Sequence, residues 1–301
     1  MPGAARSRCG TLFPVLLTSR PYVVDPVDPR APDDATWALL SEEERRRVVA
    51  SLPAEVPWEL LPPEGDEHRE ARERAMDALG RFFRTTGRRV YLSSEMGVFY
   101  PGEPRFAPDV FAVLDAELRP RRSWIVQAEG RGLDFILEVH VAGDLAKDLT
   151  GNVERYARLG IAEYFVFDKT HMRLHGYRLP PSAGGRPGAS RAYERIVSQR
   201  GRWPSELLGI DLTLEGEDLR FMVGNAPLEQ SEEVIARLGD LLDAVITREE
   251  AAERERIQEL EARLAEVERA REDERRAREA AEARVAALEA ELARRGGPPR
   301  E

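Results

Sequence analysis

Two acidic residues of this chain stand inside apolar runs. Asp109 belongs to the run 106–114, and Glu138 to the run 133–140. A carboxylate among aliphatic side chains is costly to bury unless its charge has a partner, and a divalent cation is a natural partner for two neighbouring carboxylates. If the two runs form adjacent strands, we expect a metal site between them; the alternative is that each acid meets water at a strand edge.

His140 follows Glu138 at a spacing that puts both side chains on one face of a strand. Two acids and a nearby base suit metal-dependent phosphodiester cleavage, in which the cation polarises the phosphate and lowers the pKa of the attacking water. His140 could act as a general base near neutral pH or bind a softer ion than Mg²⁺. The alternative is a hydrogen-bonded histidine of the core.

The surrounding pattern predicts the elements that would hold these residues. Apolar residues recur every three or four positions over 67–84 and 144–159, which indicates helices. Segments typical of strands cover 89–96, 108–114, 133–141 and 164–167, and a hairpin is expected over 172–179 and 192–197. The order of helix, strands, helix and strand predicts an α/β core.

The chain divides into four parts by composition. Residues 1–66 form a Pro- and Asp-rich N-terminal arm with one short helix, which Ser41 and Glu44 begin at capping-box spacing. The α/β domain is expected over 67–228, a long charged helix over 229–296, and a disordered tail over 297–301.

The long helix contains a heptad pattern. Apolar residues occupy the a and d positions at both ends of the seam, with Arg271, Glu274 and Arg278 between them. The apolar positions are Ile257, Leu260, Leu264, Val267, Ala281, Val285, Leu288 and Leu292. We predict a coiled coil, and a possible homodimer through 231–295; a single helix stabilised by Glu and Arg pairs is the alternative.

Five landmarks occur in the order found in one nuclease family. They are His68, Ala107-Pro-Asp109, Glu138-Val139, the segment 156–161 and the segment 163–168. In these landmarks the chain resembles the PD-(D/E)xK superfamily, which has the restriction-endonuclease fold, and within it the Uma-two family of endonucleases. The resemblance covers about 67–168 and extends more loosely to 228.

This resemblance implies a mixed central sheet flanked by helices and a DNA endonuclease that depends on Mg²⁺ or Mn²⁺. It implies Asp109 and Glu138 as metal ligands, with the carbonyl of Val139 as a further one. The chain departs from the family at two positions: His140 replaces the lysine after the second acid, and Asn152 stands where many members have a lysine.

Two further residues are candidates for the same site. Lys147 follows the Glu138 strand and could supply the missing cation; otherwise it is a solvated residue paired with Asp144 or Asp148. Glu95 lies between the first helix and the Asp109 strand and could reach the metal directly or through water; otherwise it faces solvent.

A locally basic region follows the core strands. Between residues 169 and 202 arginines are frequent and Glu194 is the only acid. The candidates for phosphate contact are Arg173, Arg178, Arg191 and Arg195. The alternative is a hairpin with an Arg-rich outer face.

Composition limits the remaining possibilities. The chain has 301 residues, a net charge of -10 and one cysteine, Cys9, which fits a reducing cytoplasm. It has no apolar run of about 20 residues and no phosphate-binding loop of NTPases. Besides an endonuclease, the sequence permits an inactive DNA-binding or regulatory module with a nuclease fold, and a coiled-coil scaffold with a folded head.

The two acids also predict an effect on stability. In a metal-free site their charges would repel, so alanine at Asp109 or Glu138 is expected to leave stability unchanged or to raise it.

Overall fold

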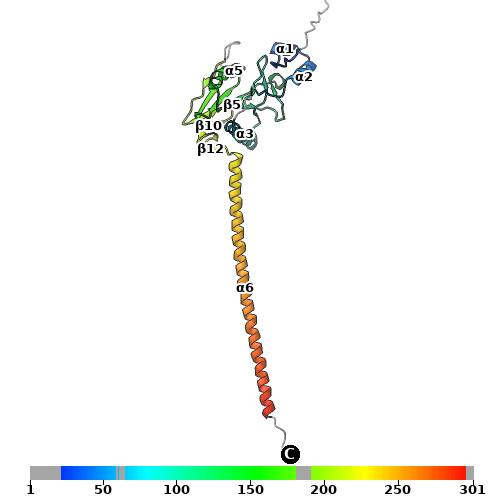
Figure 1. The fold of residues 1–301 in the computed structure, drawn as a ribbon, viewed down its shortest axis with the longest axis vertical. Coiled ribbons are helices and arrows are strands. Elements are labelled where there is room, and N and C mark those ends of the chain that lie inside the picture. Colours follow the sequence, from blue (N-terminus) through cyan, green and yellow to red (C-terminus); the bar gives the residue numbers. More distant parts are fainter. Residues whose placement is uncertain (1–21, 59, 61–64, 181–190, 296–301) are drawn as a thin grey trace, which may run out of the picture. The chain divides into compact units, whose positions relative to one another are not determined.

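The structure is a computed structural model that describes residues 22–58, 60, 65–180 and 191–295. It divides into two compact units, one ending at Ser231 and the other beginning at Glu232. The first unit is built on a six-stranded sheet (Figure 1). In spatial order its strands are β1 (Val90–Ser93), β3 (Val110–Leu114), β5 (Phe135–His140), β6 (Glu163–Asp168), β7 (Arg173–Arg178) and β8 (Glu194–Arg195).

The sheet is mixed, because β5 and β6 run parallel while the other neighbouring strands are antiparallel. The register aligns His140 at the end of β5 with Asp168 at the end of β6, and Asp168 with Arg173 at the start of β7. The predicted α/β class with a mixed central sheet is therefore confirmed, and this edge of the sheet is where the candidate site begins.

Helix α3 (Asp66–Thr86) covers one face of the sheet. Its apolar residues between Ala71 and Phe83 are buried in one cluster with alternate residues of β5. Those β5 residues are Phe135, Leu137 and Val139. Strand alternation therefore assigns Glu138 and His140 to the opposite face.

The opposite face packs against α5 (Asn152–Leu159), which follows the π-helical turn η1 (Lys147–Gly151). Tyr156 is buried there between Phe106 and Tyr164, with ring centroids 5.4 and 5.0 Å away. The helix predicted over 144–159 is thus present, but its first turn is π-helical. Three short elements extend this side: β2 (Val98–Phe99), β4 (Trp124–Ile125) and α4 (Val126–Glu129).

A second, four-stranded sheet was not predicted. Its order is β12 (Ala226–Pro227), β11 (Asp218–Val223), β10 (Ile210–Glu215) and β9 (Arg202–Ser205), all antiparallel. It packs on the side of α3, since Leu212 and Phe221 belong to the same buried cluster. The sequence signal was available, because Ile210, Leu212 and Leu214 alternate with polar residues.

The N-terminal part contains α1 (Asp34–Leu39) and α2 (Glu42–Ser51). Ser41 begins α2 with the expected capping box: its hydroxyl accepts from the Glu44 N–H, and the Glu44 carboxylate accepts from the Ser41 N–H. Buried residues on and around these helices pack against Phe99 and Ile125. The domain boundary at 66 stays a prediction.

The second unit is the helix α6 (Ser231–Arg295), drawn as one continuous helix from yellow to red in Figure 1. The long C-terminal helix is therefore confirmed, whereas its pairing stays a prediction. None of the helices in the described part of the chain combines the length and apolar character that crossing a membrane requires.

A buried ion pair joins the two sheets of the first unit. The carboxylate of Glu163, at the start of β6, accepts from Arg178 Nε at 2.8 Å, from the Ser205 hydroxyl and from the backbone N–H groups of Glu206 and Leu207. Glu163 is 1% exposed. Alanine at this position would leave several buried donors unpaired.

We expect Glu163→Ala to lower the free energy of unfolding by about 3–5 kcal/mol, because it breaks a buried, multiply bonded ion pair. Urea denaturation measures this loss. The matched control is Glu206→Ala, which removes an exposed carboxylate paired with the same Arg178 and should cost about 0.5 kcal/mol or less. Equal effects of the two variants would contradict the structural role of Glu163.

Candidate metal centre

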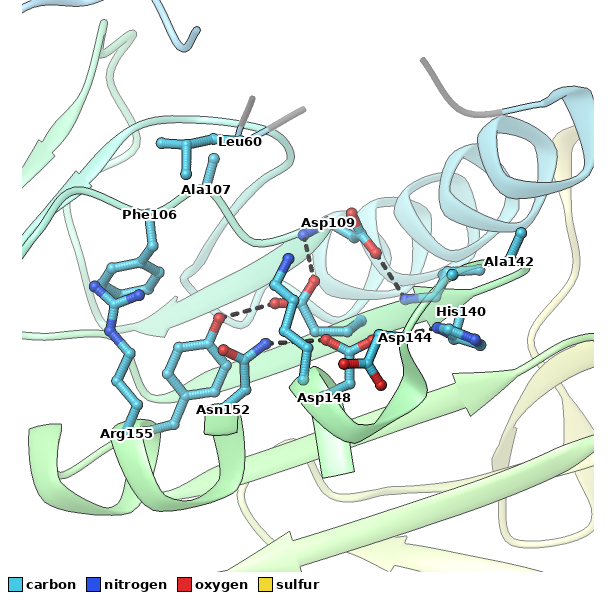
Figure 2. A pocket seen from close by; sticks show the side chains of 15 residues that line it. Leu60, Phe106, Ala107, Asp109, His140, Ala142, Asp144, Asp148, Asn152 and Arg155 are labelled. Carbon is cyan, nitrogen blue, oxygen red and sulfur yellow. Dashed lines mark hydrogen bonds and ion pairs between the residues drawn. The ribbon is translucent and has the colours of Figure 1, made fainter. Parts of the chain in front are cut away.

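The predicted acids meet in a pocket of about 280 Å³ at the edge of the central sheet. Figure 2 shows Asp109, His140 and Asp148 around this pocket, with Asn152 and Arg155 on the side of α5. The polar side chains lining the pocket are Asp109, Glu138, His140, Asp144, Lys147, Asp148, Asn152, Arg155 and Tyr156. Two sheet strands and the helix after them thus contribute to one cavity.

Asp109 and Glu138 are locked together by backbone hydrogen bonds. The N–H of Asp109 donates to Glu138 Oε2 at 3.0 Å, and the N–H of Val139 donates to Asp109 Oδ2 at 2.7 Å. Both residues are 8% exposed. Asp109 immediately precedes β3, which is antiparallel to β5, so the sheet itself places the two acids side by side.

Two buried residues outside the strands fix the orientation of these carboxylates. His68, in the first turn of α3, places Nε2 3.0 Å from Asp109 Oδ2. The hydroxyl of Tyr156 donates to Glu138 Oε1 at 2.9 Å. Among the described residues, the hydrogen bonds of the Asp109 carboxylate all involve Oδ2, so Oδ1 is the oxygen left to meet a ligand.

His140 pairs with an acid from the following helical segment. Its Nδ1 lies 3.4 Å from Asp148 Oδ2, and Asp148 Oδ1 accepts from the Asn152 side chain at 3.0 Å. A carboxylate at Nδ1 favours the tautomer in which Nε2 carries the free lone pair. The histidine is therefore arranged to accept a proton at Nε2.

The turn η1 places these helical residues at the pocket. Its i→i+5 hydrogen bond joins the Asn152 N–H to the Lys147 carbonyl. Single π-helical turns often occur at functional sites, because the added residue changes which side chains share a face. Here Lys147, Asp148 and Asn152 all line the cavity.

Burial and neighbouring negative charge disfavour the ionised form of carboxyl groups in the pocket. Burial raises the pKa of Glu138 well above its usual range, and the charge of Asp109 raises it further. Burial also raises the pKa of Asp148, although Lys147 and His140 act in the opposite direction. The cations Lys147 and Arg155 line the pocket against the four carboxyl groups of Asp109, Glu138, Asp144 and Asp148, so acidic groups outnumber basic ones there.

These shifts predict a pH-dependent stability in the absence of divalent ions. A carboxyl with a raised pKa in the folded state binds its proton more tightly than in the unfolded chain, so its contribution to stability is complete below the unfolded value, about 4.3, and is lost as pH rises through the folded value. In EDTA, the melting temperature of wild type minus that of Glu138→Gln should decrease as the pH is raised from 5 to 8.

Thermal melts of both proteins across this range measure the difference, and any constant offset from altered hydrogen bonding cancels in the slope. A melting-temperature difference that does not change with pH would contradict the raised pKa of Glu138.

The donor set fits a hard divalent cation. Among the described residues no three His, Cys, Asp or Glu side chains are grouped to hold an ion by themselves. Mg²⁺ is commonly bound through one or two carboxylates while it keeps several waters, so Asp109 and Glu138 match its needs. A cation would also relieve the repulsion that raises the pKa of Glu138.

The other predicted ligands fall in different places. Val139 lines the pocket while its side chain packs in the α3 cluster, so its main chain is the part it offers. Glu95 is not among the lining residues, because it sits in a turn with φ of 50° and its carboxylate pairs with Arg72 of α3. The Glu95 N–H donates to the carbonyl of Pro108 at 2.9 Å, so its main chain lies beside Asp109 while its carboxylate is held by Arg72. Its role as a metal ligand stays a prediction.

The four predicted phosphate-contact arginines do not form one group. Arg173 is exposed and lies opposite Asp168, at the end of the sheet that carries His140. Arg178 lies at the other end and is held by Glu163. Arg191 and Arg195 are exposed, and Arg195 pairs with Tyr177 near the Arg178 end. Of these four arginines, Arg173 alone lies at the end of the sheet where the pocket is. The loop 181–190 lies outside the described residues.

From the sequence, Asp148 is expected only as a partner of Lys147 and is not predicted as a residue of the metal site. Asp148, Asn152 and Tyr156 recur at intervals of four, which places them on one helical face. Polar residues on a face that also buries a tyrosine are the signal that could have identified this group. His68 and Tyr156 were noted as family landmarks, but their hydrogen bonds to the acids required the fold.

The hydrogen bonds also change the expectation for alanine variants. Alanine at Glu138 would leave the buried Asp109 N–H and the Tyr156 hydroxyl without their acceptor, and alanine at Asp109 would do the same to the Val139 N–H. Each unpaired buried donor costs about 1–3 kcal/mol. The prediction of unchanged or increased stability therefore omitted this cost, and amide replacements are the better probes.

Comparison with known proteins gives the family. A crystal structure described as "a putative nuclease belonging to DUF820 from Anabaena variabilis ATCC 29413" is similar with 13% identity and a TM-score of 0.37, over 48% of this chain and 75% of that one. No curated protein matches the chain. The Uma2 family model, described as "Putative restriction endonuclease", matches residues 42–215, a span that includes α2 as well as the predicted region. The match covers more than half of the chain, and the protein therefore belongs to the Uma2 (Uma-two) family of restriction-endonuclease-type nucleases.

Proposed function

We propose that this protein is a divalent-metal-dependent DNA endonuclease that hydrolyses phosphodiester bonds with Asp109 and Glu138 as its metal ligands. The observation that carries the proposal is the interlocked pair itself: two buried carboxylates, each fixed by hydrogen bonds, face one pocket beside a histidine–aspartate pair. Membership of a restriction-endonuclease family supports DNA as the substrate.

Mg²⁺ or Mn²⁺, when bound, would polarise the scissile phosphate and lower the pKa of the attacking water. Asp109 and Glu138 would hold the cation with oxygen ligands, and the main chain of Val139 is available beside them. His68 and Tyr156 keep the two carboxylates in position through their hydrogen bonds. Because of these contacts, the two carboxylates need little rearrangement to bind the cation.

His140 takes the role of general base in this proposal. Asp148 lies at its Nδ1, which leaves Nε2 to accept the proton of the attacking water. Lys147 lines the same pocket and supplies a positive charge near the phosphate, in place of the lysine that family members carry elsewhere. The two roles together compensate for the departures at His140 and Asn152.

Arg155 is suited to hold a neighbouring phosphate of the substrate. Its guanidinium lies 4.5 Å from the ring centroid of Phe106 and donates to the carbonyl of Pro104, at the wall of the pocket. A guanidinium fixed in this way still has N–H groups to donate, and it loses little entropy when it binds an anion.

We expect Arg155→Gln to raise KM for DNA by about tenfold with a smaller change in kcat, because one charge-assisted hydrogen bond contributes about 1.5–3 kcal/mol. Steady-state cleavage of a short duplex measures both constants. The matched control is Arg158→Gln on the same helix, whose side chain pairs with Glu103 and is 60% exposed. Equal KM values for the two variants would contradict a phosphate contact at Arg155.

The protein is also proposed to be a homodimer that forms through residues 231–295. This rests on the apolar heptad positions of α6, which are all exposed in the single chain.

A cleavage assay tests the nuclease. Supercoiled plasmid and single-stranded DNA are incubated with the full-length protein in Mg²⁺, Mn²⁺ or EDTA, and the proposal expects metal-dependent nicking or linearisation. The replacements at His140 and Asn152 favour one alternative, an inactive nuclease-fold module that binds DNA. Metal-dependent DNA binding without cleavage in either metal would support that alternative and contradict catalysis.

A further inference from the structure

An apolar stripe runs along α6, and its residues are exposed in the described part of the chain. The helix has 65 residues and no buried residue. The a and d positions identified from the sequence are 49–71% exposed over the large aliphatic residues. These residues are Ile257, Leu260, Leu264, Val267, Val285, Leu288 and Leu292. A stripe this narrow and this long matches the seam of a coiled coil.

We infer that α6 pairs with α6 of a second copy in a parallel, in-register coiled coil, so that two nuclease domains are held at the same end. The first argument is charge complementarity beside the seam. In a parallel dimer each g position faces the e′ position five residues later. Arginine then faces glutamate three times: Arg256 with Glu261, Arg263 with Glu268, and Arg284 with Glu289.

The two remaining g–e′ pairs of this seam have alanine at g, at Ala270 and Ala277, so no pair brings like charges together. Because the dimer is symmetric, each favourable contact occurs twice. Flanking charges of this kind determine which partner and which direction a helix selects.

The antiparallel alternative is less well matched. The alignment that sets the apolar ends against each other, with Ile257 opposite Leu288, mixes like and opposite charges in both flanking rows. Arg263 faces Arg284 and Glu261 faces Glu282, whereas Arg256 faces Glu291 and Glu268 faces Arg275. That alignment also leaves uncovered the apolar residues at the start of α6, including Leu238 and Leu242, which are 58% and 59% exposed. The parallel dimer brings both starts together.

The polar centre of the seam fixes the register. Arg271, Glu274 and Arg278 occupy successive core layers, where each faces its own copy and lies one layer from an opposite charge of the partner. The like charges within each layer cost stability, and the opposite charges of the neighbouring layers offset part of that cost. A slip of one heptad would set Arg271 against the apolar Leu264 layer. Polar residues at core positions are known to select register in this way, at a cost in stability.

Parallel pairing has a consequence for the nuclease, which rests on the proposed function. β12 ends at Pro227 and α6 begins at Ser231, so each nuclease domain is tethered at the N-terminal end of its helix. Paired helix axes lie about 8–10 Å apart, which brings the two tethers together. The effective concentration of one catalytic domain near the other then favours cleavage of both strands of one duplex.

Disulfide trapping tests the orientation independently of any nuclease activity. In a full-length Cys9→Ser background, single cysteines are placed at two d positions, Leu260→Cys and Leu288→Cys, and the proteins are oxidised and run on non-reducing gels. In a parallel, in-register dimer each d position meets its own copy, so each single variant should form a covalent dimer.

The matched control is Ala262→Cys, at an outward f position two residues from Leu260, which should cross-link far less. Light scattering of the unmodified chain should give twice the monomer mass of 33.9 kDa. Cross-linking only in a mixture of Leu260→Cys and Val285→Cys would show an antiparallel pair, and a monomeric mass would show a solitary helix; either result overturns the inference. If the protein forms the dimer but does not cleave DNA, the parallel pairing of α6 is supported and only the proposed nuclease activity is contradicted.

Discussion

Glu138→Gln is expected to abolish metal-dependent DNA cleavage, reducing kcat/KM by about 10³-fold or more. The substitution removes one of two proposed metal ligands, and a bound metal ion contributes several kcal/mol to transition-state stabilisation, with each 1.4 kcal/mol worth a factor of ten. The amide keeps the size of the side chain and one acceptor for the Tyr156 hydroxyl or the Asp109 N–H. Plasmid linearisation under single-turnover conditions measures the loss.

The control for this experiment is Glu154→Gln, which neutralises an exposed acid of α5 that does not line the pocket. Its activity should equal that of wild type. Far-ultraviolet circular dichroism of the two variants confirms that both are folded. Full cleavage by folded Glu138→Gln would rule out Glu138 as a required ligand.

His140→Gln has the second large expected effect, a loss of about 10²–10⁴-fold in kcat, which is the usual contribution of a general base. Glutamine is of similar size and can still donate to Asp148 but cannot take up a proton. Single-turnover cleavage of the same plasmid in Mg²⁺ measures this loss. Mn²⁺ binding equal to that of wild type would place the loss in catalysis and not in the metal site.

Lys147→Met separates the two possible sources of catalytic assistance. If His140 is the base, His140→Gln loses the larger share of kcat, and Lys147→Met loses rate only through the missing positive charge. If instead Lys147→Met loses the larger share of kcat, Lys147 takes the place of the lysine that family members carry after the second acid, and His140 has a structural role.

Much of the fold could be predicted because local patterns determine it. The spacing in 67–84 and the alternation around Glu138 each bury one face, and the structure has α3 and β5 there. The capping box at Ser41 and Glu44 depends on residues three apart, so it also follows from sequence. The second sheet was not predicted although β10 alternates, because β12 has only two residues and β9 contains Pro204, so their local patterns do not indicate strands.

The site was predictable in part for the same reason. Strand parity linked Glu138 with His140, and burial cost linked Glu138 with Asp109. The contacts of His68 with Asp109 and of Tyr156 with Glu138 span 41 and 18 residues and depend on how helices pack on the sheet. The pairing of Glu95 with Arg72 and of Arg178 with Glu163 likewise required tertiary structure, because composition cannot show which charges already have partners.

The most direct test of the central claim is Mn²⁺ binding measured by electron paramagnetic resonance of the free ion, titrated into the full-length protein at neutral pH. Wild type and His140→Gln should bind Mn²⁺ alike, while Asp109→Asn and Glu138→Gln should lose most of that binding. Equal binding by all four proteins, or no binding by wild type, would contradict a metal centre built on Asp109 and Glu138.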